Sequence, residues 1–70
     1  MVEVYKTNVT KKTQSRKLCA ALAEAFPSAK INFDLADCDK VLRVEDDKLE
    51  APKIIGLVNQ NGFSCDVLDG

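Results

Sequence analysis

The chain has 70 residues, which is enough for one small domain over residues 1–70 and too few for a second. Hydrophobic residues make up 46% of it and charged residues 30%, with a net charge of −1, as in a soluble globular domain. No apolar run approaches ~20 residues and there is no signal peptide, which argues against a membrane span and predicts an unanchored cytoplasmic protein.

The net charge conceals an asymmetry along the chain. Residues 1–30 carry six basic and two acidic side chains, a sum of +4, whereas residues 31–70 carry four basic and nine acidic ones, a sum of −5. If folding keeps the two halves apart, we expect the molecule to present two faces of opposite sign.

The first element is a half-buried strand over residues 2–6. Val2 and Val4 alternate with Glu3 and Tyr5, which is the pattern of a strand with one covered and one solvated side. This pattern places the two valines on the covered face of a sheet and the glutamate and tyrosine on the open face.

A helix follows a polar loop. Thr10 or Asn8 is a suitable N-cap, and Pro27 ends the helix after about Phe26. Apolar residues at helical spacing form one stripe that faces the core, and Cys19 borders it. The stripe consists of Leu18, Leu22, Ala25 and Phe26.

Two strands and a turn come next. Alternation predicts strands over 31–35 and 41–45, and the polar turn 36–39 joins them into a hairpin. Leu42 and Val44 are the residues of the second strand that face the core.

A second helix and a last strand complete the chain. Pro52 suits the first turn of a helix, and Gly62 is a natural left-handed terminator. Alternation over 63–68 then predicts a strand with Cys65 directed inward. Apolar positions of this helix at the expected spacing are Ile54, Leu57 and Val58.

The order strand, helix, strand, strand, helix, strand predicts an α+β fold. It is the ferredoxin-like βαββαβ two-layer sandwich, in which two helices cover one face of a four-stranded antiparallel sheet. The other face is expected to be open. It would carry Glu3, Tyr5, Asn32, Asp34, Val41, Arg43, Ser64, Asp66 and Leu68.

Five segments spread over nearly the whole chain carry a further signal. They are Val9-Thr10, Leu18-x-x-Ala21-Leu22, Ala29 to Phe33, Lys40 to Glu45, and Ile54-x-x-x-Val58-x-x-x-Gly62-Phe63-x-Cys65. In these segments the chain resembles the heavy-metal-associated (HMA) domain, the fold of copper chaperones and of the metal-binding modules of copper-transporting ATPases. The resemblance implies the fold described above and the use of the first loop and helix as a docking surface.

The resemblance also implies where a metal site would lie. The motif of that family is Met-x-Cys-x-x-Cys in the first loop, and its methionine aligns with Val9 and its two cysteines with Lys11 and Gln14. A linear Cu(I) site needs two soft thiolates, whereas a protonated ammonium cannot ligate and an amide oxygen is a weak ligand. We therefore predict that the metal site is lost and that the chain holds no cofactor.

Basic residues gather at the start of the first helix. Free N–H groups and the helix dipole already favour anions there, so the cluster is a candidate docking or anion-binding site. The simpler alternative is a solvated helix face, which most charge runs are. The candidate residues are Thr10, Lys11, Lys12, Gln14, Arg16 and Lys17.

Few other residues carry chemistry. Histidine is absent, and no catalytic triad or carboxylate pair is recognisable, so we predict that the protein is not an enzyme. Cys19 and Cys65 are expected to be buried as small hydrophobic residues and Cys38 to be exposed, an arrangement that argues against a shared metal site. Only Tyr5 would offer a base-stacking ring on the open face, which argues against a nucleic-acid partner.

Three functions remain open from the sequence. The leading one is a non-catalytic interaction module that docks an acidic protein through the first helix, without membrane contact. The alternative is a divergent carrier of a metal ion or small anion that uses other ligands. The third is a structural subunit or self-associating dimer, since the sequence leaves the oligomeric state undetermined.

Overall fold

Six elements follow one another in the predicted order. The computed structural model describes residues 1–68 and gives them these bounds: β1 Val2–Thr7, α1 Lys12–Ala25, β2 Lys30–Asp34, β3 Val41–Glu45, α2 Ala51–Gln60 and β4 Cys65–Val67. The βαββαβ prediction is confirmed, including the β2–β3 hairpin. No helix in this described part of the chain has the length and apolar character that crossing a membrane requires.

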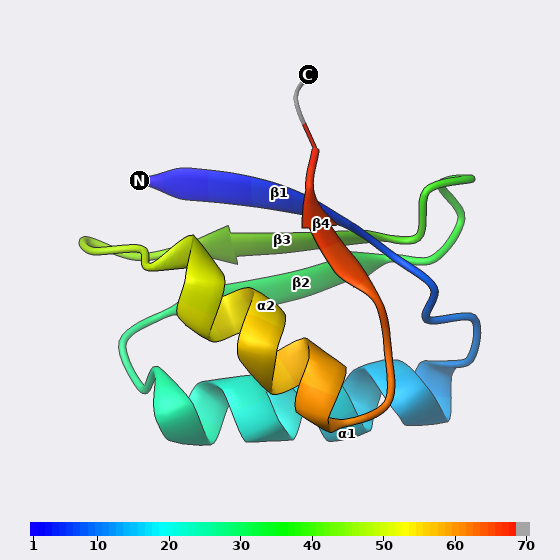
Figure 1. Ribbon diagram of the computed structural model, residues 1–70, viewed down its shortest axis with the longest axis horizontal. Helices are drawn as coiled ribbons and strands as arrows, with labels where there is room; N and C mark the ends of the chain where they lie inside the picture. The colour runs from blue at the N-terminus through cyan, green and yellow to red at the C-terminus, as the bar shows by residue number, and fades with distance from the viewer. Residues whose placement is uncertain (69–70) are drawn as a thin grey trace.

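The four strands form one sheet in the order β2-β3-β1-β4, and every neighbouring pair is antiparallel. The strand that comes first in sequence therefore lies inside the sheet, while β2 and β4 form its two edges. Both helices cover the same face of the sheet; in the view of Figure 1 α1 lies below the sheet and α2 crosses in front of its lower part. The opposite face is open, as predicted.

The core lies between the sheet and the two helices. Each of its members is at most 3% exposed, and each larger apolar side chain removed from water contributes about 1.5–3 kcal/mol. Ala25, which was expected in the core-facing stripe of the first helix, is exposed instead. Seven of the expected inward positions are in the core, namely Leu18, Leu22, Leu42, Val44, Ile54, Val58 and Cys65. The full set is Tyr5, Val9, Leu18, Leu22, Leu42, Val44, Ile54, Val58 and Cys65.

The facing of β1 differs from the prediction. Tyr5 is fully buried and lies opposite Leu42, whereas Val2 is 45% exposed and Val4 borders a hollow on the open face. Glu3 and Tyr5 were thus wrongly placed on the open face, because side chains alternate along a strand and a shift of one position moves every one of them to the other side. The tyrosine ring fills more of the core than a valine would.

The end of α2 shows why Gly62 is needed. Its φ of 89° lies in the left-handed region, and its N–H bonds to the carbonyl oxygen of Asn59 at 3.0 Å. The N–H of Phe63 bonds to the carbonyl oxygen of Val58 at 3.2 Å. These two bonds form a Schellman motif, which ends the helix and turns the chain toward β4.

Candidate functional site

The loop between β1 and α1 is fixed at several points. Val9 is fully buried, and its N–H donates to the hydroxyl oxygen of Thr7 at 3.3 Å. That hydroxyl in turn donates to the carbonyl oxygen of Lys40, while the N–H of Ser64 donates to the side-chain oxygen of Asn8 at 2.9 Å. The loop is therefore attached both to the β2–β3 hairpin and to the segment that leads into β4.

Gln14 organises the first turn of α1. Its side-chain oxygen accepts hydrogen bonds from the backbone N–H groups of Thr10 and Lys11, each at 3.2 Å, and from the Thr10 hydroxyl at 3.4 Å. The N-cap residue is Lys11, so the prediction of Thr10 or Asn8 as the cap is wrong. The glutamine replaces a conventional cap because it reaches back from the third helical position to the loop N–H groups, as in a capping box.

Exposed cations occupy the first two turns of the helix. We call Lys11, Lys12, Arg16 and Lys17 the basic face; all four are exposed, and no acidic residue lies in the first turn of α1. Within residues 1–68 the ion pairs are Lys6–Asp39 at 3.8 Å and Lys53–Glu50 at 2.6 Å, so none involves the basic face.

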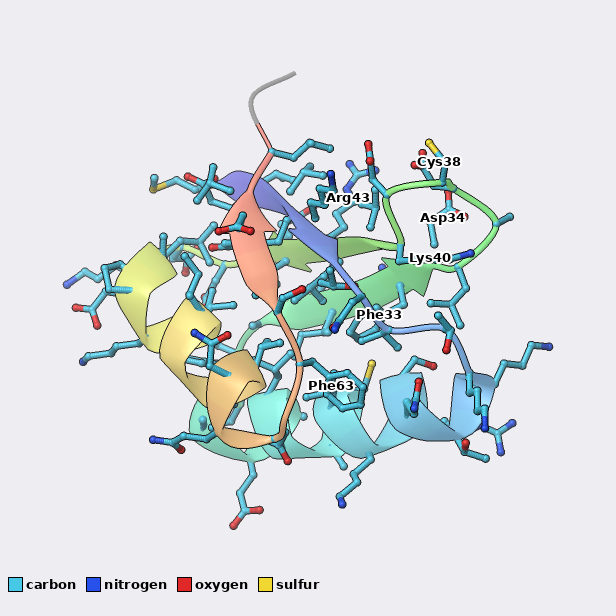
Figure 2. All side chains as sticks on the ribbon, turned by 45° about the vertical axis from the view of Figure 1, so that its right-hand side comes forward. Phe33, Asp34, Cys38, Lys40, Arg43 and Phe63 are labelled. Carbon is cyan, nitrogen blue, oxygen red and sulfur yellow. The ribbon has the colours of Figure 1, made fainter. Side chains whose placement is uncertain are left out.

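A shallow hollow adjoins the basic face. Lys12, Ser15 and Arg16 line one side of it and the segment 33–36 lines the other, around a volume of about 530 Å³. Figure 2 shows Phe33 and Asp34 at the same end of the molecule as the first turns of α1. The hollow thus brings together the cations of Lys12 and Arg16 with Asp34 and Phe33.

The predicted separation of charge by sequence half is not maintained. Because β1 lies between β3 and β4, the basic half of the chain is interleaved with the acidic half. Lys6 accordingly pairs with Asp39 on the hairpin turn, at 3.8 Å. The four cations of the basic face stay near one another because all of them lie at the start of α1.

The three thiols lie on different elements. Cys65 is buried, as predicted, and burial followed by the charge of Asp66 raises its pKa to about 11. Cys19 is half-buried rather than buried, and burial raises the pKa of its thiol as well. Cys38 is exposed on the turn between β2 and β3, as predicted.

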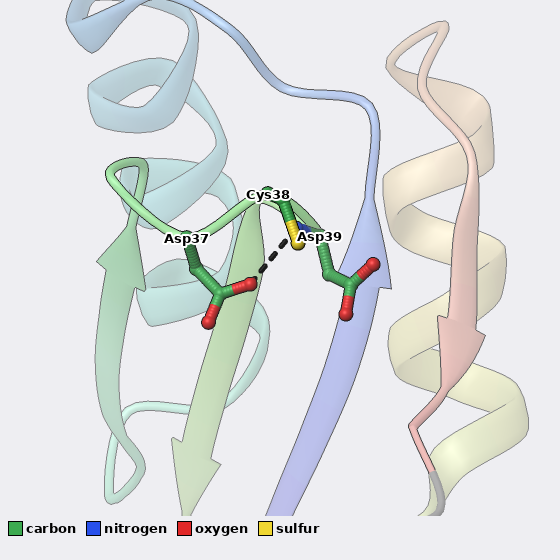
Figure 3. Close-up of side chains that lie close together, drawn as sticks. All are labelled: Asp37, Cys38 and Asp39. Carbon is green, nitrogen blue, oxygen red and sulfur yellow. Dashed lines mark hydrogen bonds between the residues drawn. The ribbon is translucent and has the colours of Figure 1, made fainter.

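Sequence reasoning did not identify the side-chain cluster on this turn. The potential ligand atoms of Asp37, Cys38 and Asp39 all lie within 4.8 Å of one another (Figure 3). The backbone N–H of Asp39 donates to Asp37 Oδ1 at 2.8 Å, so the turn satisfies part of this carboxylate itself. The signal available in the sequence was the run of three consecutive residues Asp37-Cys38-Asp39. Exposed acidic groups commonly occur without a bound ion, so the cluster alone does not indicate a metal site.

The comparisons with known proteins agree with this geometry. No protein family and no curated protein sequence matches the chain. Among solved structures, the yeast copper transporter domain CCC2A, studied in its apo and Cu(I)-loaded states, is similar with a TM-score of 0.80. The match covers 97% of this chain and 94% of that chain at 17% sequence identity.

The chain has the fold of an HMA domain. The resemblance inferred from the sequence is therefore confirmed at the level of the fold. The loop between β1 and α1 contains no cysteine, so it offers no thiolate for Cu(I). The Gln14 oxygen is moreover occupied by three hydrogen bonds. Cys19, Cys38 and Cys65 do not form a common group of ligands within residues 1–68.

Proposed function

We propose that this HMA-like chain is a non-catalytic interaction module that binds an acidic surface of another protein through its basic face and has lost the Cu(I) site of the first loop. The observation that carries the proposal is the row of four exposed cations on the first two turns of α1, with no ion pair to any described residue. The free N–H groups of these turns add to the positive potential.

The rigidity of the loop supports a docking role. The bonds of Gln14 to Thr10 and Lys11, together with the buried Val9, hold the start of α1 in one arrangement before any partner arrives. A surface that is already ordered loses less conformational entropy on binding. The hollow beside Lys12 and Arg16 would admit a side chain of the partner.

The chemistry of the chain supports a role without catalysis. The sequence has no histidine, and the raised pKa values of Cys19 and Cys65 keep both thiols protonated at neutral pH. A protonated thiol is a poor nucleophile. Three free cysteines also fit a reducing compartment, for which we propose the cytoplasm.

Docking can be tested with a synthetic glutamate-rich peptide as the acidic probe. We expect NMR amide shifts to centre on residues 10–17 and to weaken steeply with added salt, since exposed charge pairs are screened. The double substitution Lys12→Glu, Arg16→Glu should weaken the response by about tenfold or more. The matched control is Lys48→Glu, Lys53→Glu near the start of α2. An equal loss in both double variants would contradict the proposal.

Loss of the metal site can be tested separately. The reduced protein should not retain Cu(I) against a chromophoric chelator, whereas Lys11→Cys, Gln14→Cys should, because the two thiolates would then lie one helical turn apart beside a helix N-terminus. Each single variant is the control. Tight stoichiometric binding by the unaltered chain that Cys38→Ser abolishes would favour the divergent carrier instead.

A further inference from the structure

The strand β2 is an open edge of the sheet. It pairs with β3 on one side only, and its register runs from Lys30 opposite Glu45 to Asp34 opposite Val41 without a bulge. It contains no proline, and its side chains alternate between exposed and half-buried. The outward N–H and C=O groups of such a strand are available for pairing with another strand.

The sequence of β2 is complementary to itself. If two copies lie antiparallel with Asn32 opposite Asn32, then Lys30 of each lies opposite Asp34 of the other. On the covered face the same register places Ile31 opposite Phe33, a β-branched residue against an aromatic one. Opposite charges and aromatic–aliphatic pairs are the cross-strand combinations that stabilise a sheet.

We propose that two copies of this chain associate through their β2 edges, antiparallel about a two-fold axis at Asn32, and join their sheets into one of eight strands. Lysine on an edge strand ordinarily blocks such contacts. Here Lys30 has no ion pair with any residue in 1–68, and the second copy supplies Asp34 as its partner. The proposal is independent of the docking function above.

Alternation allows only a few registers. The helices of both copies cover the same face of the joined sheet only if open-face residues of one β2 lie opposite open-face residues of the other. Because side chains alternate along a strand, a residue can exchange its opposite partner only for one two positions away. The nearest alternatives pair only three residues of each strand and leave the charges of Lys30 or Asp34 opposite Asn32. The next ones bring Lys30 against Lys30 or Asp34 against Asp34, which repel. Centring on Asn32 alone pairs all five residues and both charges.

The helix beside this edge permits the approach. Lys12, Ser15 and Arg16 line the hollow next to the end of β2, so this side of α1 faces the edge. Helical spacing continues that side through Cys19 and Ala23, which are small. The two α1 helices can therefore approach closely near the axis, while the cations at each N-terminus remain at the outer ends.

The proposal can be tested by reversing the charges at positions 30 and 34 and measuring dimerisation by sedimentation velocity over a range of concentrations. The unaltered chain should dimerise, and Lys30→Asp or Asp34→Lys should each weaken dimerisation by about tenfold or more, because each creates two repelling pairs. An equimolar mixture of the two variants should recover a dimer, since every pair is then one lysine and one aspartate. The combined variant Lys30→Asp, Asp34→Lys should recover it too. A monomeric unaltered chain at ~1 mM, or a mixture without recovery, would overturn the proposal.

Cross-linking tests the axis without relying on charge. In a Cys19→Ser, Cys38→Ser background, Asn32→Cys places one thiol of each copy directly across the axis and should give a disulfide-linked dimer under mild oxidation. Lys30→Cys in the same background is the matched control and should not, because the two thiols would then lie four positions apart along the strands. Equal cross-linking of the two variants would refute the register.

Discussion

The two faces of the sheet obey different constraints. On the covered face Tyr5, Leu42 and Val44 are at most 1% exposed and lie against the helices. On the open face the corresponding neighbours include Arg43, which is exposed, and Val4, which is half-buried at the border of a hollow of about 690 Å³. The same strands supply both sets, so the difference comes from alternation alone.

This contrast shows which substitutions the fold tolerates. A side chain of the covered face has atoms packed around it, so its volume and polarity are fixed. A side chain of the open face has water on one side and can change with little effect on stability. Binding functions can therefore change on the open face, the edges and the start of α1 without loss of the fold.

The largest expected effect comes from removing volume on the covered side. Leu42→Ala on β3 should lower the free energy of unfolding by about 2–5 kcal/mol, because the fully buried side chain leaves a cavity. Arg43→Thr on the open face, which keeps a residue suited to a strand, should change it by about 0.5 kcal/mol or less. Urea denaturation of the two variants measures both. Equal losses would show that the two faces do not differ as described.

High pH should lower the free energy of unfolding through two buried groups of the covered side, Tyr5 and Cys65. Burial, followed by the charge of Glu3 and of Cys65, raises the pKa of Tyr5 to about 12, and burial raises that of Cys65 to about 11. Both groups are neutral when protonated, so the unfolded chain loses these protons at lower pH than the folded chain does. Stability is therefore complete below about pH 9 and falls above it, by roughly 3 kcal/mol near pH ~10.5.

Denaturation midpoints across this range provide the measurement for the pH effect. In Cys65→Ala the fall should be smaller, because only Tyr5 and Cys19 then remain with a pKa that burial raises in the folded chain. A variant with the same pH profile as the unaltered chain would exclude Cys65 as the cause.

A smaller effect concerns the hydroxyl group of Tyr5. It is buried and has no hydrogen-bond partner among the residues that the structure describes. An unsatisfied buried hydroxyl is costly, so Tyr5→Phe should raise the free energy of unfolding by about 1 kcal/mol. The midpoint of chemical denaturation at neutral pH tests this, and a fall on removing the hydroxyl would point to a partner for it.

The smallest effects come from two glycines at which a substitution changes the backbone free energy but not the packing. A Cβ added at Gly56 or at Gly62 meets no atom within 4 Å, so neither site lacks space. Gly56→Ala lies within α2 and should stabilise by about 0.5–1 kcal/mol, because alanine loses less backbone entropy than glycine. Gly62→Ala should destabilise by about 1 kcal/mol, because its φ of 89° is unfavourable for a residue with a Cβ. Thermal unfolding of the two variants should shift in opposite directions.

The sequence was sufficient for the elements and their order. Pro27, Pro52 and Gly62 mark helix boundaries through rules that depend on single residues, and the structure places those boundaries as expected. The alternation in β2 and β3 likewise gave the correct facing of Leu42 and Val44. The helix boundaries and the facing of these two strands depend on residues close in sequence, so they could be predicted without knowledge of the tertiary structure.

The facing of β1 required information from outside the strand. The pattern favoured Val2 and Val4 for the covered face, whereas the pairing of Tyr5 with the buried Leu42 shows that the opposite set faces the core. The cap at Lys11 was missed for a similar reason, since Gln14 acts from the third helical position. The role of the basic face stays a prediction, because exposure alone does not name a partner.

The inner position of β1 has a consequence for folding kinetics. The β2–β3 hairpin joins neighbouring segments and can close early, whereas the pairing of β1 with β4 joins the two ends of the described chain. Contacts between distant residues must first overcome the entropy of closing a long loop, which slows folding. The short β4 should therefore dock last and open first, and its amide hydrogens should exchange with solvent sooner than those of β1 and β3.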